Sequence, residues 1–520
     1  MRSRSLLIGL VLALGTTTVA TNQAQAIVGG TESTQAYSFM GSFQPAYPAP
    51  PRADSHGCGV VVLAPQWVLT ASHCAGKNPT GSRVGVPQGW KVRVGSPNTT
   101  SGGEVAEVDH YYRLAIERDQ GGYWGKDLAL LHLRTPVRAK PVKIASATPA
   151  ANTPTRIMGW GMTCDDFGNP ACFPTKLREA DTVVQPASAC GSDRVGELCI
   201  GSRDGSVGAT NMDSGGPALV REGDQWAVAG TVTGPSGDRM PTHYTDVTMY
   251  TDWINGIISG TNVPPDDQIP NVEGAVNLDG CTGSVVRTAT SRPQDRALML
   301  TNGRCVGEGW PAPGKALVNQ PADVKVPIAN RQGYPRVTAH ADRLVYATMT
   351  GTDIALYRLD KTYAQLKSAR AKVFRLTTTP ARAGDRLTMA YASQRWSCTA
   401  ETVVKQLREG DHQQDDAIRY SASPGCAPYD TSPAGSALLA PDGGTVMGVH
   451  STQNMDGGKC VTDNPCEVLP DGSVTAVQGR NYGQQVHMIA SCLTQGSELD
   501  LSRKGCTLTG STHRPATPTR

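Results

Sequence analysis

The chain has 520 residues, enough for two to four domains of ordinary size. Phe is scarce, with 5 residues, whereas Gly (57) and Pro (36) are plentiful, and this composition favours turn-rich β structure over helix bundles. The net charge is +3, and about +1 remains once Arg2 and Arg4 of the leader described below are removed. So balanced a charge argues against nucleic acid or an anionic membrane as a partner.

The N-terminus is typical of a secretory signal peptide, which we expect over residues 1–26. Two arginines precede the apolar run 6–14, and a polar stretch leads to a small-residue cleavage site at Ala26. A second cleavage site after Ala20 would leave a six-residue propeptide. The apolar run is too short to cross a bilayer and no other stretch is long enough, so we expect no membrane protein.

The chain contains fourteen cysteines, an even number that indicates disulfides formed in an oxidising compartment. We therefore expect a secreted, extracellular protein. A cytosolic zinc protein would carry CxxC pairs, and the sequence has none. Histidines such as His56, His110, His340 and His450 have no metal-ligand spacing. We therefore expect neither a metal nor a cofactor, and interpret these histidines as solvated or packed residues.

Three motifs in the first half carry residues suited to nucleophilic catalysis. Residues 69–74 (LTASHC) contain His73, residues 127–131 (DLALL) contain Asp127, and residues 213–217 (DSGGP) contain Ser214. A serine hydroxyl at its ordinary pKa is too weak to attack a peptide bond. It needs a base to accept its proton and a group to orient that base. His73 and Asp127 are candidates for these two roles.

These motifs, their order and the Gly-Trp-Gly turn at 159–161 resemble trypsin-like serine proteases over about residues 27–260. The resemblance implies a serine endopeptidase acting on protein or peptide substrates. His73 would be the general base, Asp127 its orienting group and Ser214 the nucleophile. The backbone N–H groups of Met212 and Ser214 would form the oxyanion hole.

The sequence Ile27-Val28-Gly29-Gly30 resembles the mature start of the same family. The resemblance implies that the new α-amino group of Ile27 pairs with Asp213 and holds the nucleophile turn in its working shape. Activation by a tryptic enzyme is not indicated, because no Lys or Arg precedes Ile27. Read without the resemblance, the four residues indicate a strand followed by a turn.

Cysteine pairs in the first half follow from the resemblance and from proximity. The resemblance implies a Cys58–Cys74 bond that brackets the histidine loop and a Cys190–Cys199 bond ahead of the nucleophile. Cys164 and Cys172 are close enough in sequence to link a surface loop. Each such bond typically contributes about 2–4 kcal/mol.

The first half departs from the trypsin pattern around the nucleophile. Trypsin has an aspartate six residues before its serine, and Gly208 stands here instead. The neighbouring wall positions are Pro235 and Thr242, in an alignment that can slip by one residue. Thr210 replaces a cysteine that often pairs across the pocket. Because no acid would meet an Arg or Lys side chain, we expect non-tryptic specificity for an apolar or small residue.

Met212 is a sharper departure, because the family nearly always has glycine there. Any residue except proline carries the N–H donor, but glycine tolerates conformations that a side chain resists. Losing one such donor typically costs on the order of 100–1000-fold in rate. Three outcomes therefore stay open: an intact oxyanion hole, a slower enzyme, or a hole that forms only with substrate bound.

The second half, which we expect to form a domain over 271–510, repeats the motif order and resembles a bacterial group of secreted trypsin-like peptidases. Arg304 stands at the histidine position, Asp353 is retained, and Pro433 aligns with the serine. Arginine cannot act as a base at neutral pH, and proline has no hydroxyl. Under a shifted alignment Ser432 or Ser436 would be the nucleophile, but neither would have a histidine base. We therefore predict a pseudoprotease domain.

The second-half cysteines are also even in number. Cys281–Cys305 parallels the histidine-loop bond, and Cys460–Cys466 joins near neighbours in sequence. Order along the chain suggests the pairs Cys398–Cys426 and Cys492–Cys506.

Together these features predict an all-β chain of two tandem chymotrypsin-like domains over 27–260 and 271–510. Each domain would be a pair of antiparallel six-stranded β-barrels, with a short C-terminal helix in the first. Residues 261–270 would be a linker, and 511–520 a disordered tail.

We expect one active site, in the first domain. The second domain would bind substrate, position a partner, or regulate or inhibit the first, with a possible contact between the two. The alternative is a wholly non-catalytic secreted binding protein built from two pseudoprotease domains.

Overall fold

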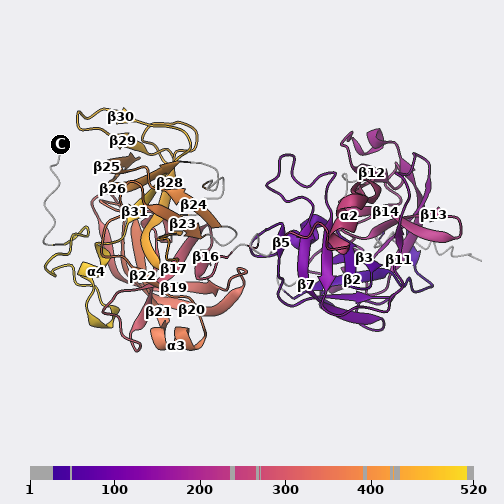
Figure 1. Cartoon of the computed structure of the whole chain (residues 1–520), viewed down its shortest axis with the longest axis horizontal. Helices are drawn as coiled ribbons and strands as arrows, with labels where there is room; N and C mark the ends of the chain where they lie inside the picture. The colour runs from indigo at the N-terminus through magenta and orange to yellow at the C-terminus, as the bar shows by residue number, and fades with distance from the viewer. Residues whose placement is uncertain are drawn as a thin grey trace, which may run out of the picture.

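The computed structural model describes residues 27–46, 50–234, 241–264, 269, 271–307, 309–390, 395–421, 426 and 434–511. The expected signal peptide, Pro235, Pro433, half of the expected linker and most of the expected tail lie outside the described residues. Strands before residue 260 pair only with one another, as do strands after residue 271. Figure 1 shows the two halves as separate bodies. The domain limits themselves remain a prediction.

The first half begins with a closed antiparallel barrel. Its sheet order runs β7-β6-β2-β3-β4-β8, and β8 pairs back to β7. A two-residue strand, β5 (Val84–Gly85), adds to its edge. The six barrel strands are β2 (Met40–Pro45), β3 (Cys58–Ala64), β4 (Trp67–Thr70), β6 (Trp90–Val94), β7 (Glu104–Arg113) and β8 (Ala129–Leu133).

A second closed barrel follows in the chain. Its order runs β11-β10-β13-β14-β15-β12, and β12 pairs back to β11. Two short strands, β1 (Thr31–Glu32) and β9 (Lys143–Ile144), add to this sheet. The six barrel strands are β10 (Pro154–Gly159), β11 (Arg178–Gln185), β12 (Glu197–Ile200), β13 (Pro217–Glu222), β14 (Gln225–Gly234) and β15 (Thr242–Asp246).

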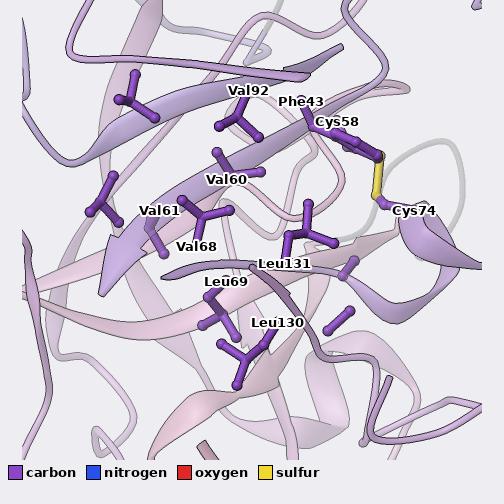
Figure 2. Close-up of a cluster of buried hydrophobic side chains, with 14 of the residues drawn as sticks. Phe43, Cys58, Val60, Val61, Val68, Leu69, Cys74, Val92, Leu130 and Leu131 are labelled. Atoms are coloured by element: carbon purple, nitrogen blue, oxygen red, sulfur yellow. A yellow bond between two sulfur atoms is a disulfide. The ribbon is translucent and has the colours of Figure 1, made fainter. Parts of the chain in front are cut away.

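The core explains why the chain forms strands here. β3 carries the run Val60-Val61-Val62, whose branched side chains favour extended backbone, and all three are fully buried. Figure 2 shows valines of β3 packed with side chains of other strands of the same barrel, including Phe43, Val92 and Leu131. The same hydrophobic cluster includes Met158 and Leu219 of the second barrel. The two barrels therefore pack against each other through a shared core.

Helices are few and short. α1 (Ser72–Gly76) follows β4, and α2 (Thr251–Ile258) closes the first half after the 3-10 turn η3 (Val247–Tyr250). Ile254 and Ile257 lie one turn apart on α2 and are buried in the shared core. The predicted all-β class, with two closed six-stranded barrels in the first half and a short helix at its end, is confirmed. Within the residues described, no helix is long and apolar enough to span a bilayer.

The second half starts with another closed ring of six strands, ordered β16-β19-β20-β21-β18-β17, in which β17 pairs back to β16. β22 (Phe374–Leu376) then runs parallel to β17 and to β28, so it joins this ring to the remaining strands. The ring strands are β16 (Ala275–Leu278), β17 (Cys281–Arg287), β18 (Arg296–Thr301), β19 (Ala316–Ala329), β20 (Pro335–Thr348) and β21 (Ile354–Thr362).

The remaining strands form a second path in the order β24-β23-β27-β28-β31-β26, extended by β25, β29 and β30. Two short helices, α3 (Tyr363–Ser368) and α4 (Ile489–Cys492), complete this half. The strands are β23 (Arg386–Ala390), β24 (Arg395–Thr399), β25 (Thr402–Glu409), β26 (His412–Ser421), β27 (Ala437–Leu439), β28 (Thr445–Gln453), β29 (Cys466–Val468), β30 (Val474–Thr475) and β31 (Arg480–Gln485).

The α2 contact with the shared core yields a stability prediction. Truncating the fully buried Ile254 to Ala removes apolar burial and leaves a cavity, so it should lower the free energy of unfolding by about 2–5 kcal/mol. Asn255→Ala, on the exposed side of the same helix, should change it by less than about 0.5 kcal/mol. Urea denaturation of the two variants measures both values. Equal effects would show that α2 does not anchor the core.

Candidate active site

His73 and Asp127 are brought together by two neighbouring strands. β4 leads into α1, which carries His73, and Asp127 lies just before β8; the antiparallel register pairs Thr70 with Ala129. His73 Nδ1 lies 2.7 Å from Asp127 Oδ2, and the His73 backbone N–H donates to Asp127 Oδ1 at 2.9 Å. Asp127 is fully buried. A carboxylate at Nδ1 keeps the proton on that nitrogen and leaves Nε2 as an acceptor.

Ser214 lies in the turn before β13, and this turn packs on the strands that lead to His73. The Ser214 carbonyl accepts a hydrogen bond from Gly59 N at 2.8 Å. Gly215 has φ +76°, and a Cβ there would collide with Thr70 Oγ1. Glycine is therefore required by both the conformation and the close approach. Among the described residues, no hydrogen bond joins Ser214 Oγ to His73 Nε2.

A disulfide links the residue after His73 to strand β3, and it is one of seven in the described chain. Cys58 of β3 bonds to Cys74, the residue after His73, and Figure 2 shows this bond beside the core. The structure forms seven disulfides, which are Cys58–Cys74, Cys164–Cys172, Cys190–Cys199, Cys281–Cys305, Cys398–Cys426, Cys460–Cys466 and Cys492–Cys506. Within the described chain no cysteine is free.

The carboxylate of Asp213 is fully buried among hydrogen-bond donors. Asp213 Oδ1 accepts from Gly161 N at 2.7 Å, and Oδ2 accepts from Thr210 N at 2.8 Å and Thr210 Oγ1 at 3.1 Å. Burial raises the pKa of Asp213 from 3.8 to about 6, although hydrogen bonds from Thr210, Gly161 and the Ile27 backbone oppose the rise. Ile27 is itself fully buried, so the structure brings the predicted activation pair together.

The Gly-Trp-Gly turn at the end of β10 forms the wall of this carboxylate site. A Cβ on Gly159 would collide with Asp213 Oδ1, and one on Gly161 would collide with Asp213 Oδ2. Both glycines are needed because the backbone lies against the carboxylate.

Met212 adopts the left-handed backbone conformation, with φ +71°. Glycine adopts this region without strain, whereas a residue with a Cβ pays roughly 1–2 kcal/mol. The Met212 carbonyl is held by His56 Nε2 at 3.1 Å. The side chain at this position therefore does not prevent the turn from taking a conformation suited to glycine.

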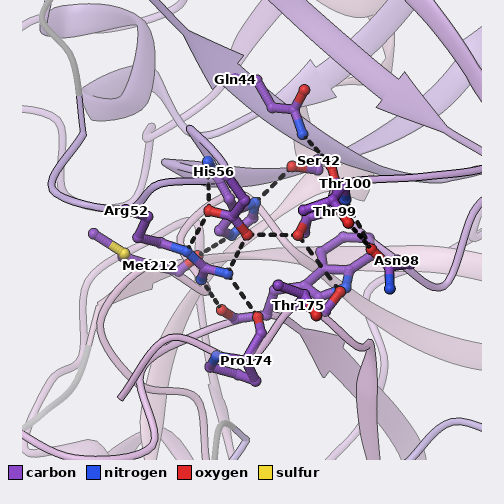
Figure 3. Close-up of polar contacts among 12 residues, drawn as sticks. Ser42, Gln44, Arg52, His56, Asn98, Thr99, Thr100, Pro174, Thr175 and Met212 are labelled. Atoms are coloured by element: carbon purple, nitrogen blue, oxygen red, sulfur yellow. Dashed lines mark hydrogen bonds and ion pairs between the residues drawn. The ribbon is translucent and has the colours of Figure 1, made fainter. Parts of the chain in front are cut away.

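A buried polar network surrounds the Met212 carbonyl, as Figure 3 shows. His56 Nδ1 lies 2.8 Å from Ser42 Oγ, and the His56 backbone N–H donates to Asp54 Oδ1 at 3.2 Å. Arg52 binds the same carboxylate with two of its nitrogens, at 2.8 and 2.6 Å. Arg52 also donates to the carbonyls of Trp160 and Pro174. Both side chains of this ion pair are almost completely buried.

The protonation state of His56 follows from this network. Burial, together with the charge of Arg52, lowers the pKa of His56 to about 3, so the imidazole is neutral at neutral pH. A carbonyl only accepts hydrogen bonds, so Nε2 carries the proton and donates to Met212. Nδ1 then accepts from the Ser42 hydroxyl. The sequence left His56 as a solvated or packed residue and gave no sign of this contact, because Met212 is distant in the chain.

The predicted specificity positions Gly208 and Thr242 lie side by side. A Cβ on Gly208 would lie 3.1 Å from Thr242 Oγ1, which accepts a hydrogen bond from Ala209 N at 3.0 Å. Gly208 N also donates to the Val28 carbonyl at 3.3 Å, which ties the N-terminal segment to this position. Pro235, the third predicted position, lies outside the described residues.

In the second half, Arg304 occupies the place of the histidine but forms a buried ion cluster. Arg304 Nε lies 2.7 Å from Asp353 Oδ2, and Nη2 lies 2.7 Å from Glu409 Oε2. Although burial opposes it, the charges of Asp353 and Glu409 raise the pKa of Arg304 further above its ordinary value. Ser451 Oγ donates to Asp353 Oδ2 at 2.7 Å. Sequence reasoning did not anticipate Glu409 or Ser451.

The structure corrects the predicted alignment of the second-half nucleophile turn by one residue. Ala434, and not Pro433, holds the place of Ser214. The Ala434 carbonyl accepts a hydrogen bond from Thr282 N at 2.7 Å, and the Ser214 carbonyl accepts the equivalent hydrogen bond from Gly59 N. Gly435 then matches Gly215: it has φ +88°, and a Cβ there would collide with Thr301 Oγ1.

Contacts with the neighbouring strand agree with this correction. In the second half, Gly435 N and the Ser436 carbonyl both form hydrogen bonds with the backbone of His450. In the first half, Gly215 N and the Gly216 carbonyl form the same two hydrogen bonds with the backbone of Val232. Pro433 itself lies outside the described residues. The position thus carries alanine, which also has no hydroxyl.

Comparisons with known proteins agree with this arrangement. Residues 27–254 match the family described as Trypsin. Beta-fibrinogenase of Macrovipera lebetinus is 30% identical over 217 residues, covering 40% of this chain and 79% of the relative. Trypsin-3 of Homo sapiens is 29% identical over 259 residues, covering 48% and 78%. These matches and the barrel pair define a serine endopeptidase. The chain belongs to the trypsin family.

A solved structure of neuropsin, a serine protease of mouse brain, aligns with 44% of this chain and 98% of its own, at 23% identity and a TM-score of 0.36.

The raised pKa of Asp213 leads to a pH prediction for the chain in which Ile27 is still joined to Ala26. Between about pH 4 and 6 the folded state holds a proton that the unfolded state has lost, so stability falls as pH rises through this window. At 1.36 kcal/mol per unit, the decrease is about 3 kcal/mol. In Asp213→Asn this decrease should be absent.

Urea denaturation at several pH values measures the slope, and the exposed Asp224→Asn serves as the control that should keep the wild-type slope. An unchanged slope in Asp213→Asn would contradict the assignment.

The left-handed backbone of Met212 leads to a second prediction. Glycine relieves the strain at this position, whereas the β-branched valine increases it. Met212→Val should therefore be less stable than Met212→Gly by at least about 1 kcal/mol. Thermal and urea unfolding of the two variants measure the difference, and equal stability would show that residue 212 is not held at positive φ.

Proposed function

We propose that the first half is the catalytic domain of a secreted serine endopeptidase with Ser214, His73 and Asp127 as its triad. The observation that carries the proposal is the pair of contacts between His73 and the buried Asp127, at 2.7 and 2.9 Å. Two contacts fix both the position and the tautomer of the imidazole. Substrates are proteins or peptides, as for trypsin-like proteases in general.

The proposed reaction proceeds through an acyl-enzyme. Ser214 Oγ attacks the scissile carbonyl carbon while His73 Nε2 accepts its proton, and Asp127 stabilises the imidazolium that forms. The tetrahedral intermediate collapses, and His73 donates the proton to the leaving amine. Water then attacks the acyl carbon with His73 again as base, which releases the acid and regenerates Ser214.

The oxyanion hole is formed by the backbone N–H groups of Met212 and Ser214. Its support is the positive φ of Met212 and the hydrogen bond of its carbonyl to His56, which together set the orientation of the turn. Of the three outcomes left open by the sequence, these observations favour a preformed hole.

Cleavage after Ala26 would convert the Ile27 amide into an α-amino group beside Asp213. An α-amino group has an ordinary pKa of about 7.7–8.0, so it is charged at neutral pH and in mildly acidic solution. Its charge would lower the pKa of Asp213 and replace the cost of the unpaired buried carboxylate with an ion pair. The support is that Ile27 is already buried next to Asp213.

Specificity is proposed to be non-tryptic. Gly208 and the uncharged Thr242 form the described part of the pocket, so an Arg or Lys side chain of the substrate would meet no acid there. An apolar or small side chain fits these residues better.

The proposed organisation is a signal peptide over 1–26, a protease domain over 27–260, a linker over 261–270, a pseudoprotease domain over 271–510 and a tail over 511–520. The second domain is non-catalytic and serves binding or regulation. Its support is the buried Arg304 cluster at the histidine position and Ala434 at the serine position. The seven disulfides fit an oxidising, extracellular location.

A fluorophosphonate probe tests the assignment of the nucleophile. The mature protein should be labelled once, and Ser214→Ala should abolish labelling. Asp127→Asn should lower kcat for a peptide library by about 10⁴-fold, because the imidazole loses its tautomer. Ser432→Ala and Ser436→Ala, in the second half, should leave labelling unchanged.

Labelling that survives in Ser214→Ala would refute the proposal. A mature protein that neither reacts with the probe nor cleaves the library would instead support the non-catalytic binding protein.

A further inference from the structure

Three potential metal ligands meet on two neighbouring strands of the first barrel, and none of them belongs to the proposed triad. Asp109 and His110 lie on β7, and His132 lies on β8. Asp109 Oδ1 lies 2.6 Å from His132 Nδ1 and 3.3 Å from His110 Nδ1. One ligand atom from each of the three residues lies within 4.8 Å of the others. None of them takes part in the catalytic steps proposed above.

A β-bulge brings the three side chains to one face of the sheet. Val108 pairs with Leu133 and His110 pairs with His132, so Asp109 is an extra residue in β7. Successive side chains of a regular strand point to opposite faces, which would separate Asp109 from His110. At a bulge, two residues oppose one residue on the partner strand. Asp109 and His110 therefore both face His132.

Aromatic packing holds the two imidazole rings. Trp67 of β4 pairs across the sheet with His132, and their ring centroids are 4.7 Å apart. Tyr112 lies two residues after His110 on β7, and the two rings stack at 6.4 Å. Trp67 and Tyr112 also contact each other, at 5.8 Å. A ligand set held in this way loses little side-chain freedom when it binds an ion.

The site is charged and accessible to water. Asp109 supplies a carboxylate, and His110 and His132 supply imidazole nitrogens. The side chains of Asp109, His110 and His132 are 23%, 31% and 27% exposed. Neither Lys nor Arg forms an ion pair with Asp109 within the described residues. A cation can therefore reach the carboxylate without displacing another positive side chain.

We propose that Asp109, His110 and His132 bind a divalent transition metal ion of the zinc class, through one carboxylate oxygen and two imidazole nitrogens. Imidazole and carboxylate together suit Zn²⁺ and its neighbours, and water would complete the coordination. Ligand atoms around one tetrahedral zinc ion lie about 3.4 Å apart, given bonds of about 2.1 Å. The separations of 2.6 and 3.3 Å at Asp109 are close to this value, and the ligand atoms of all three residues lie within 4.8 Å of one another.

The bound ion would cross-link β7 to β8. Strand β8 begins two residues after Asp127. Because metal binds the folded chain and not the unfolded one, its expected effect is a higher unfolding temperature. Catalysis does not require it, and the proposal stands independently of the proposed protease function.

Zinc titration of the full chain, stripped with chelator, tests the site by calorimetry, and Co²⁺ absorption reports the ligand geometry. Wild type should bind one Zn²⁺ per chain and unfold at a higher temperature with the ion. Asp109→Asn, which keeps the shape of the side chain, and His132→Gln should each weaken Zn²⁺ binding at least tenfold and lose the thermal shift.

The control is His340→Ala. His340 lies 3.7 Å from Asp323 without a second imidazole, so this variant should bind as wild type does. Absence of saturable binding in wild type would overturn the proposal, as would wild-type affinity in a folded Asp109→Asn. Binding that is lost in His73→Ala but kept in Asp109→Asn would place the ion at the triad and would also overturn it.

Discussion

The buried carboxylate of Asp213 is the constraint on which the Ser214 turn depends. An ionised carboxyl group without water must be surrounded by donors, and Gly161, Thr210 and Ile27 supply them. These donors come from three separate segments, so the charge can be satisfied only when the second barrel and the N-terminal segment have assembled. Ser214 is the next residue, and its position is set by this arrangement.

Met212 shows how the surroundings maintain a strained backbone. A side chain at φ +71° is unfavourable by itself, yet the carbonyl of this residue is bound to a neutral, fully buried His56. The His56 backbone N–H donates to Asp54, and the buried Arg52 binds the carboxylate of Asp54. Strained conformations persist when several independent contacts determine them, and they concentrate at functional sites.

The two halves separate what the fold needs from what the chemistry needs. Both nucleophile turns have a glycine at positive φ packed against a threonine hydroxyl, at Gly215 and Gly435, because a Cβ would collide there. The positions of the serine and the histidine are not restricted to one residue type in this way. The second half has Ala434 at the serine position, and Arg304 at the histidine position gains Glu409 as a second partner. The second half keeps Asp353 within a buried ion cluster, but it has neither the histidine nor the serine of the first half.

Short motifs in the sequence were sufficient to predict the all-β class and the candidate triad, because each motif is a run of adjacent residues and the motifs follow one another in a characteristic order. Tertiary structure alone decided the backbone of Met212 and the contact of His56. It also decided the placement of Ala434 and the meeting of Asp109 with His132. Each of these depends on the register between distant strands or on a bulge, and one extra residue moves a side chain to the other face. Short sequence patterns do not determine the register between distant strands, so the register is known only from the folded chain.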